Sequence, residues 1–346
     1  MRPAKRNEKA KAPKRRRTTT GARLEEVARL AGVSPITVSR VINKPELVTE
    51  GTRRAVQDAI AKIAYVPNLT AGSLASQKTR LIAAVFPTIA HSIFSETIQG
   101  LSDRLADSGY QLVLGVSGYG ASREDALVQT ILARRPDGVL LTGVVHSEVA
   151  RRFLVQAGIP VVETWDFTKT PIDMLVGFSH YGVGQAMAKY FLRRGYLRPA
   201  VISADDQRAT ARAQGFLDTL RDAGMNPPSL TVAAPSSLEK GRRALRELLK
   251  AHPTTDAVFC GSDIIAAGAL LEAQASGVPV PKQLAVAGFA DMELAAQMTP
   301  SLTTVSVEGY RIGTLAAEML LQRIGGGKPP ESVLDTGFRI IERESA

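Results

Sequence analysis

The segment "VARLAGVSPITVSRVIN", residues 27–43, joins two short helical patterns through the tetrapeptide "AGVS". Gly32 can adopt the positive φ angle with which many helices end. Ser34 suits the N-cap of the next helix, and Pro35 suits its first position, where the missing N–H costs nothing. The segment therefore predicts two helices that are joined by a tight turn.

A third predicted helix completes this unit, which spans residues 22–66. Thr49 can cap the third helix, and Pro67 ends it. Each helix carries an apolar stripe at i, i+3, i+4 spacing, and the stripes comprise Leu24, Val27, Ala28 and Ala31, then Val38, Val41 and Ile42, then Val56, Ala59, Ile60 and Ile63. These stripes predict a small helix-turn-helix bundle that is no more than marginally stable alone.

The positive charge of the chain is concentrated in its first quarter. Residues 1–78 contain 17 Lys and Arg against 6 Asp and Glu, a net charge of +11, whereas the remaining residues have a net charge of −1. This asymmetry indicates an anionic polymer or membrane surface as the partner of that segment. Residues 1–21 are predicted to be a disordered basic tail, which either assists binding to that partner or only improves solubility.

Length and composition indicate an ordinary globular α/β protein. The chain has 346 residues, 45% of them hydrophobic, enough for two or three domains. No apolar run approaches the roughly 18 residues of a membrane span, and no signal-peptide core is visible, so we expect a cytoplasmic protein without a membrane partner. The single cysteine, Cys260, excludes an intramolecular disulfide and a cysteine-rich zinc site.

After residue 80, strand-like apolar runs alternate with amphipathic helical stretches. One series lies at 81–86, 110–116, 138–143 and 159–164, and a second at 174–178, 199–204, 256–261, 284–289 and 302–307. Continuous apolar runs that are linked by helices predict parallel sheets covered on both faces. Two series predict two doubly wound lobes. Because such sheets bind ligands at the carboxyl ends of their strands, we expect a small-molecule site between the lobes.

The segment "LEEVARLAGVSPITVSRVINKPELVTEGTRRAVQDAIAKIAYVPN" resembles the headpiece of lactose-repressor (LacI-type) transcription regulators. The resemblance covers residues 22–343, and "GIPVVE", "DMLVGFSHYGVGQAM", "GYGASREDALVQTIL" and "TGVVHS" are most similar to the gluconate-operon repressors. It implies an all-α helix-turn-helix headpiece, a hinge over 67–79, and a periplasmic-binding-protein-like double lobe over 80–346 for effector binding and dimerisation. The first lobe would comprise 80–178 and 309–337, and the second 179–308 and 338–346.

The same resemblance implies a homodimer that binds double-stranded, pseudo-palindromic operator DNA. The implied DNA-binding residues are Ser34, Pro35, Ile36, Thr37, Ser39, Arg40, Asn43, Asn68 and Leu74. Arg40 can contact guanine N7 and O6 with two hydrogen bonds, although a solvated helix arginine is the alternative. Asn68 would cap a hinge helix, and Leu74 would insert into the minor groove unless it only joins hinge and lobe. Since no leucine heptads follow residue 343, a coiled-coil tetramer is not expected.

The implied ligand-binding residues are Thr88, Phe94, His146, Trp165, Phe178, Arg208, Arg212, Asp263 and Asp291. Arg212 matches the arginine with which members of the family bind their ligand, and its guanidinium can form two parallel hydrogen bonds to a carboxylate. Ala290 occupies the position of a common family aspartate, and the acidic residue is displaced to Asp291. The resulting positive site favours a sugar acid such as gluconate or a ketogluconate. Alternatives to ligand contact stay open for these residues. The arginines could lie on the surface, His146 could have a structural role, and Trp165 and Phe94 could belong to the core.

The resemblance thus implies a repressor whose operator affinity a ligand shifts by about 1–3 kcal/mol of coupling. An enzyme is not expected, because GxSxG, HExxH, P-loop and GxGxxG motifs are missing, and "GVSGY" at 115–119 ends in Tyr119. Asp205 and Asp206 are better placed to cap a helix than to bind metal, so no metal or cofactor is expected. The alternatives are a regulator that responds to a neutral sugar or purine, and a solute-binding protein.

Overall fold

The computed structural model describes residues 23–66, 78–89, 92–144 and 146–346. The chain divides into two compact units, Met1–Lys78 and Thr79–Ala346, and each is described here by itself. The predicted hinge residues Asn68 and Leu74, and the basic tail, lie outside the described residues. No helix within the described ranges is long and apolar enough to cross a membrane.

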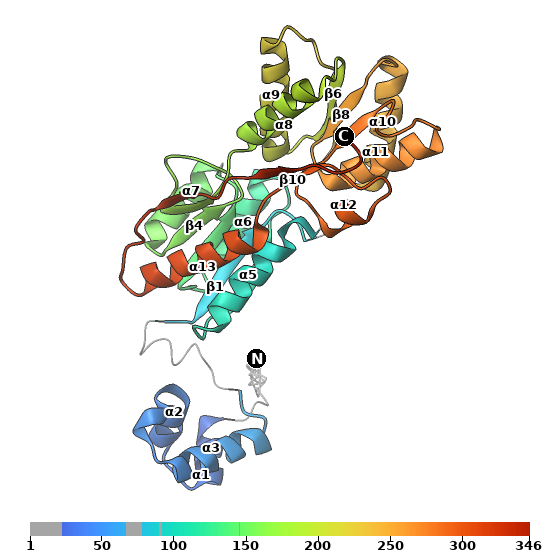
Figure 1. The fold of residues 1–346 in the computed structure, drawn as a ribbon. Helices are drawn as coiled ribbons and strands as arrows, with labels where there is room; N and C mark the ends of the chain where they lie inside the picture. Colours follow the sequence, from blue (N-terminus) through green and yellow to red (C-terminus); the bar gives the residue numbers. More distant parts are fainter. Residues whose placement is uncertain (1–22, 67–77, 90–91, 145) are drawn as a thin grey trace, which may run out of the picture. The chain divides into compact units, whose positions relative to one another are not determined.

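The described residues of the first unit form the α-helices α1 (Leu24–Ala31), α2 (Pro35–Asn43) and α3 (Glu50–Lys62), with the short 3-10 helix η1 (Pro45–Leu47) between α2 and α3 (Figure 1). Gly32 ends α1 with a φ of 66°, and the Oγ of Ser34 accepts a hydrogen bond from the Thr37 amide, as the capping residues predict. Thr49 holds the N-cap position of α3 without a side-chain cap. The core of this unit consists of Val27, Ala28, Val38, Val41, Val56, Ala59 and Tyr65.

The first lobe of the second unit is built on a six-stranded parallel sheet. Its strand order is β11 (Val333–Asp335), β5 (Met174–Gly177), β4 (Val161–Thr164), β3 (Gly138–Thr142), β1 (Leu81–Phe86) and β2 (Gln111–Val116). Successive residues of β1 are buried on opposite faces of the sheet. Ala83 and Val85 pack with residues of α6 (Ala121–Leu132) and α7 (Glu148–Ala157). Ile82 and Ala84 pack with α5 (Ser95–Ala106) and α13 (Gly309–Ile324), so both faces are covered.

The second lobe repeats this plan around a four-stranded parallel sheet. Its order is β7 (Ser229–Val232), β6 (Pro199–Ala204), β8 (Ala257–Cys260) and β9 (Ala285–Ala287). The helices α8 (His180–Arg194) and α9 (Gln207–Asp222) cover one face. On the other face lie α10 (Leu238–Ala251) and α11 (Asp263–Ala275). Parallel sheets with helices on both faces confirm the predicted fold class.

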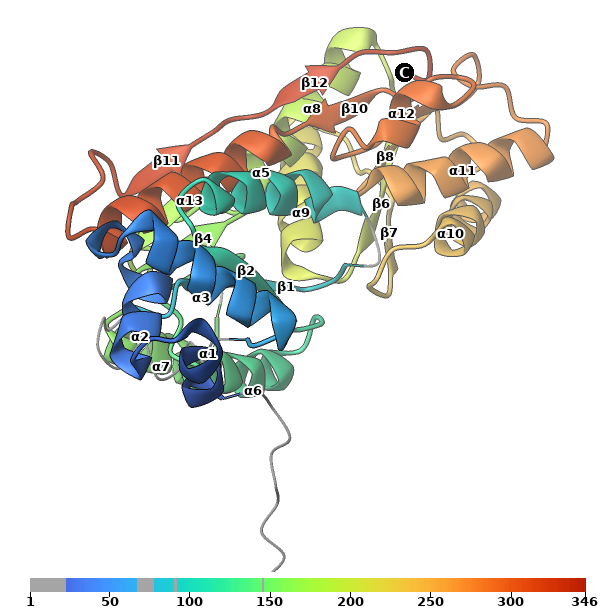
Figure 2. The ribbon, with the colours of Figure 1, turned by 90° about the horizontal axis from the view of Figure 1, so that it is seen from below.

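Three features of the sheets differ from the prediction. The run at 174–178 forms β5 of the first sheet rather than opening the second series. The run at 302–307 contains β10 (Thr304–Ser306), which pairs antiparallel with β12 (Arg339–Ile341) in a separate sheet. The short strands β7, β11 and β12 were not predicted, because their residues are polar or half-exposed and carry no continuous apolar run. Figure 2 shows the chain passing from β11 beside the first sheet to β12 beside the second lobe.

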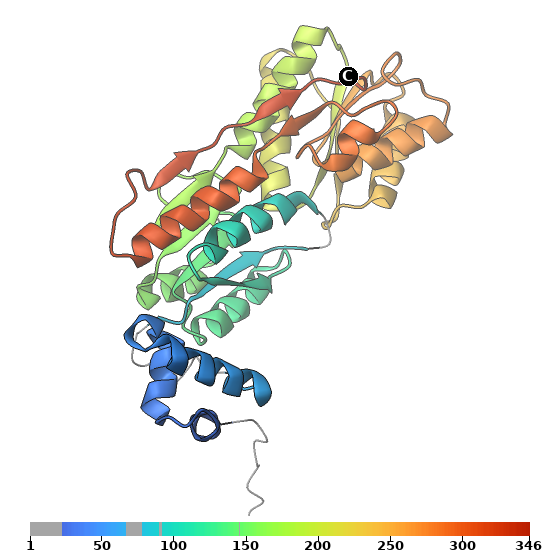
Figure 3. The same cartoon turned by 60° about the horizontal axis from the view of Figure 1, so that its bottom comes forward.

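Glycines bring several helix pairs into close backbone contact. In the α8–α9 pair, a Cβ on Gly184 would lie 1.9 Å from the Arg212 carbonyl oxygen, and one on Gly215 would lie 2.1 Å from that of Tyr181. The helices α5 and α13 run side by side (Figure 3). A Cβ on Gly313 of α13 would clash in the same way with the carbonyl oxygen of Thr97 on α5. A side chain at these positions would force the helices apart, so glycine sets the spacing from which the site is built.

Candidate functional site

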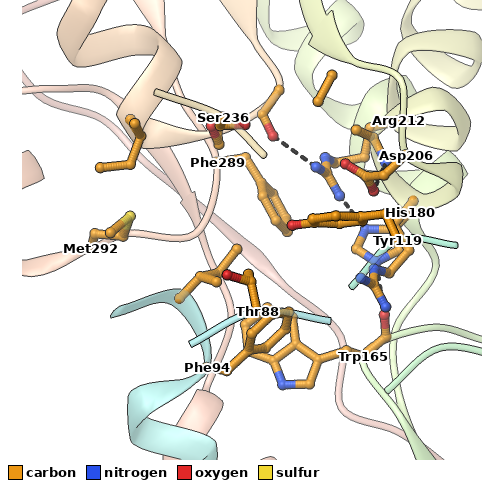
Figure 4. A pocket seen from close by; sticks show the side chains of 17 residues that line it. Thr88, Phe94, Tyr119, Trp165, His180, Asp206, Arg212, Ser236, Phe289 and Met292 are labelled. Atoms are coloured by element: carbon orange, nitrogen blue, oxygen red, sulfur yellow. Dashed lines mark hydrogen bonds between the residues drawn. The ribbon is translucent and has the colours of Figure 1, made fainter. Parts of the chain in front are cut away.

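A pocket lies where the carboxyl ends of both sheets face each other (Figure 4). The wall is formed by segments after β1, β2, β4 and β5 of the first sheet and after β6, β7, β8 and β9 of the second. Its walls consist of Thr88, Ile93, Phe94, Tyr119, Trp165, His180, Ala204, Asp206, Arg208, Ala209, Arg212, Ser236, Gly261, Ser262, Ile264, Phe289 and Met292. The pocket therefore combines aromatic rings with hydroxyl groups and charged groups, as small-molecule sites do.

Arg212 is the most buried cation of the pocket, with 5% of its surface exposed. Its Nη1 donates to His180 Nδ1 at 2.8 Å and its Nη2 to the Gly261 carbonyl at 2.7 Å, while Cζ lies 3.9 Å from the centre of the Phe289 ring. Burial lowers the pKa of Arg212 to about 10, so the guanidinium stays charged at neutral pH. Its Nε has no hydrogen-bond partner among the described residues. Such a group is well prepared to bind an anion.

His180 begins α8 and is buried beside Arg212. Since a guanidinium only donates, Nδ1 of His180 must accept, and Nε2 donates to the Trp165 carbonyl at 2.8 Å. These two hydrogen bonds select one neutral tautomer of the imidazole. Burial, followed by the charges of Arg212 and Arg208, holds the pKa of His180 well below 6.5. His180 is therefore uncharged at neutral pH.

Trp165 links the pocket to the helices of the first lobe. Its indole Nε1 donates to Thr97 Oγ1 at 2.9 Å, and Thr97 in turn donates to the carbonyl of Gly309 at 2.9 Å. The indole packs edge-on against Phe94, with ring centres 5.0 Å apart. Because Gly309 begins α13, the tryptophan is anchored to both α5 and α13.

Arg208 and Asp206 are the half-exposed charged groups of the wall. Asp206 caps α9 through the Ala209 amide at 3.1 Å, as predicted from the paired aspartates. The guanidinium of Arg208 lies 5.8 Å from the centre of the Phe94 ring and against Gly143. With His180 neutral, the charged wall residues Arg208, Arg212 and Asp206 leave one net positive charge.

Five of the predicted ligand-binding residues, Thr88, Phe94, Trp165, Arg208 and Arg212, lie in the pocket wall, and four do not. Phe178 lies behind the wall, packed against Trp165 and His180. Asp263 is fully buried, and its carboxylate accepts hydrogen bonds from Thr304 Oγ1 at 2.6 Å and the Met292 amide at 2.7 Å. Burial raises the pKa of Asp263 to about 6. Its carboxylate is thus engaged in holding the loop after β9.

The other two, His146 and Asp291, are engaged by charged partners. Asp291 binds Arg343 Nη2 at 2.7 Å and so ties its loop to the C-terminal segment. His146 hydrogen-bonds Glu124, and its Nε2 lies 3.4 Å from the buried carboxylate of Glu163. Burial alone would lower the pKa of His146, but its interactions with Glu124 and Glu163 outweigh burial and raise this pKa to about 9. These four residues are therefore not part of the pocket wall, and the fold supplies each of them with other partners.

The raised pKa of His146 predicts a specific pH dependence of stability. The pKa of His146 is about 9 in the folded protein and 6.5 for the free side chain, so the folded state binds the proton more tightly than the unfolded state. The stabilisation of the fold by His146 is therefore complete below pH 6.5, and it is lost as the pH rises through 9. His146→Gln should cost up to about 3 kcal/mol near pH 6 and progressively less toward pH 10. Urea unfolding of both chains across this range measures the difference. The exposed His252→Gln is the control, and a pH-independent difference for His146→Gln would contradict the prediction.

Tyr119, His180, Asp206, Ser236 and Phe289 were not predicted as pocket residues. A signal was available for four of them, because Tyr119, His180 and Asp206 follow predicted strands and Phe289 ends one. Ser236 follows β7, which was not predicted. What the pattern does not show is which side of a loop faces the cleft. His180 in particular looks like an ordinary first residue of a helix.

In the first unit, the predicted DNA-binding residues lie on and before α2. Pro35, Ile36 and Arg40 are exposed, and Ile36 has 67% of its surface free although it is a large apolar residue. Thr37 and Ser39 are half-exposed, and Ser34 holds the cap. The side chain of Asn43 is outside the described set. One face of α2 is therefore buried in the bundle, and the other presents one cation and an apolar side chain.

A helix-turn-helix unit followed by two parallel-sheet lobes around a pocket is the architecture of a class of DNA-binding transcriptional regulators. The family model for bacterial regulatory proteins of the lacI family matches residues 23–68, and a periplasmic binding protein-like domain matches residues 188–346. The transcriptional regulator GntR of Pseudomonas aeruginosa is 39% identical over 338 residues, covering 97% of this chain and 98% of that protein. The chain belongs to the lacI family.

Solved structures show the same likeness. A LacI-family regulator from Silicibacter pomeroyi has a TM-score of 0.89 at 34% identity, covering 94% of this chain and 99% of that one. The transcription regulator GntR from Chromobacterium violaceum has a TM-score of 0.74 at 38% identity, covering 77% of this chain and 98% of that one.

Proposed function

We propose that this transcriptional regulator controls genes of sugar-acid catabolism, and that gluconate or a ketogluconate in the pocket changes its operator affinity. The main support is the charge balance of the pocket wall, which contains two arginines, Arg212 and Arg208, and a single carboxylate, Asp206. The same wall also holds hydroxyl groups. A carboxylate would pair with the arginines, while Asp206 and the hydroxyls would bind the polyol chain. The resemblance to gluconate-operon repressors supports the same ligand class.

We further propose that the regulator acts as a homodimer. The strand β2 lies at one end of its sheet, and Val113, Leu114 and Val116 expose 48%, 43% and 49% of their surfaces. An exposed apolar edge strand invites pairing or aggregation unless a partner covers it. A second copy of this chain would cover this edge and bring two headpieces to a pseudo-palindrome of about 14–20 base pairs.

A titration tests the ligand class. Trp165 is the only tryptophan of the chain and lies in the pocket wall, so its fluorescence reports occupancy directly. D-gluconate and ketogluconates are expected to bind and to change the affinity for operator DNA. Tight binding of a neutral sugar or a purine, with no binding of sugar acids, would favour the alternative ligand class. A dimer-sized particle in analytical ultracentrifugation is the expected assembly.

The proposed DNA contact predicts the effect of one substitution. Arg40→Ala should cost about 1–3 kcal/mol of operator binding and relax specificity at one base pair in each half-site. Binding to a set of single-base operator variants measures both effects. Arg54→Ala, which removes a charge from the exposed side of α3, serves as the control. Unchanged base preferences in the Arg40 variant would contradict the assignment.

A further inference from the structure

Both hydrogen-bond acceptors that hold Arg212 are uncharged. His180 Nδ1 and the Gly261 carbonyl each accept one N–H, and the Phe289 ring packs against the guanidinium plane. Among the described residues, no carboxylate oxygen lies within ion-pair distance of this guanidinium. Asp206 and Asp166 act on the guanidinium electrostatically, but neither is in ion-pair contact with it. The orientation of Arg212 is therefore fixed by uncharged groups, and its charge has no contacting counterion among the described residues.

The neutrality of His180 follows from its own surroundings. Its Nε2 donates to the Trp165 carbonyl at 2.8 Å, so the opposite nitrogen carries the lone pair that Arg212 uses. A second proton would have no acceptor and would face the guanidinium directly. The imidazole thus acts as a rigid, uncharged acceptor that is clamped between the two lobes.

We propose that His180 makes the pocket selective for acids, because it orients Arg212 through an uncharged acceptor and so reserves the guanidinium charge for a ligand carboxylate. This inference rests on the proposed sugar-acid ligand and names the residue that sets its charge. An aspartate at position 180 could orient Arg212 equally well. It would, however, pair with the arginine and remove the attraction for a second carboxylate.

The position of Arg212 makes this choice of acceptor consequential. The side chain is almost completely buried, and charges interact more strongly in such a site than in water. The contacts of Gly184 and Gly215 hold α8 and α9 at close range, so His180 and Arg212 are not free to separate. A change of charge at position 180 therefore alters the affinity of any ligand that binds Arg212.

A pair of variants that differ only in charge tests the proposal. In His180→Asn and His180→Asp, an Oδ1 atom takes the place of Nδ1, and both variants lose the bond to the Trp165 carbonyl. Trp165 fluorescence is titrated with sodium D-gluconate and with neutral D-glucitol, which has a carbon chain of the same length. His180→Asn should bind gluconate within about tenfold of the wild type, whereas His180→Asp should bind it about 30-fold or more weakly than His180→Asn. His180→Asp should also lose the preference for gluconate over glucitol.

Operator binding without ligand and thermal unfolding verify that both variants are folded, and a variant that fails to fold is replaced by the pair His180→Gln and His180→Glu. Equal gluconate affinities of the two folded variants would overturn the role of His180 and leave the sugar-acid ligand standing. A wild-type chain that binds none of the sugar acids would instead overturn the proposed function, and this inference with it. A purely structural role for His180 would weaken gluconate and glucitol binding alike in both variants.

Discussion

Arg212→Met is expected to weaken sugar-acid binding about 100-fold or more, because it removes charge-assisted hydrogen bonds worth about 1.5–3 kcal/mol each. Operator affinity should then no longer respond to the ligand at concentrations that saturate the wild type. Stability should also fall, by about 1–3 kcal/mol, because His180 Nδ1 and the Gly261 carbonyl lose their donor, a cost that relief of the desolvation of the guanidinium partly offsets. Trp165 fluorescence and operator binding with and without gluconate measure the two effects.

Arg221→Met provides the matched control for this prediction. Arg221 lies on the same helix, α9, but its side chain is half-exposed and pairs with Asp218 outside the pocket. It loses the same charge, so any general electrostatic effect appears in both variants. Wild-type gluconate affinity in Arg212→Met would show that the ligand binds elsewhere.

Gly184→Ala is expected to lower both stability and ligand affinity. The added Cβ would lie 1.9 Å from the Arg212 carbonyl oxygen and 2.7 Å from the Phe216 amide nitrogen, both of them backbone atoms. Relief of this clash requires α8 and α9 to separate, which should cost about 1–3 kcal/mol or more. It also stretches the hydrogen bond between His180 and Arg212, so we expect gluconate affinity to fall about tenfold or more.

Gly241→Ala separates the two effects. A Cβ on Gly241 would lie 2.3 Å from the Ile265 carbonyl oxygen, a clash of the same kind between α10 and α11. This variant should lose similar stability in urea unfolding while keeping the hydrogen bond between His180 and Arg212. If both variants lose the same ligand affinity, the spacing of α8 and α9 has no special role in the site.

Local chemistry explains why the helix-turn-helix unit was predicted almost residue by residue. Gly32, Ser34 and Pro35 act on their own helix ends, within three or four residues, and their roles are the same in any tertiary context. Most strand runs were predicted for a related reason, because burial on both faces leaves a continuous apolar segment in the sequence. The edge strand β2 carries such a segment although much of it is exposed. The exposed edge strands β7 and β11 lack that segment and were missed.

The candidate site was only partly predictable. Family resemblance and strand ends both indicate Thr88, Trp165 and Arg212, and all three lie in the pocket wall. His146 was assigned to the ligand by the same reasoning, yet Glu124, 22 positions earlier, and Glu163 hold its imidazole. A strand end shows that a residue is near the cleft, but not whether another side chain already occupies it.

Sequence alone therefore determined the fold class, the capped helix α2, the family and the arginines of the pocket wall, since these follow from periodicity, capping and motif spacing. Tertiary structure alone decided which charged side chains contact an oppositely charged side chain and which can pair with a ligand. Asp291 is neutralised by Arg343, 52 positions away, whereas Arg212 meets the uncharged His180, 32 positions away. The physical reason is that a charge is compensated by whatever the fold places within a few ångströms of it, and such neighbours are distant in the chain.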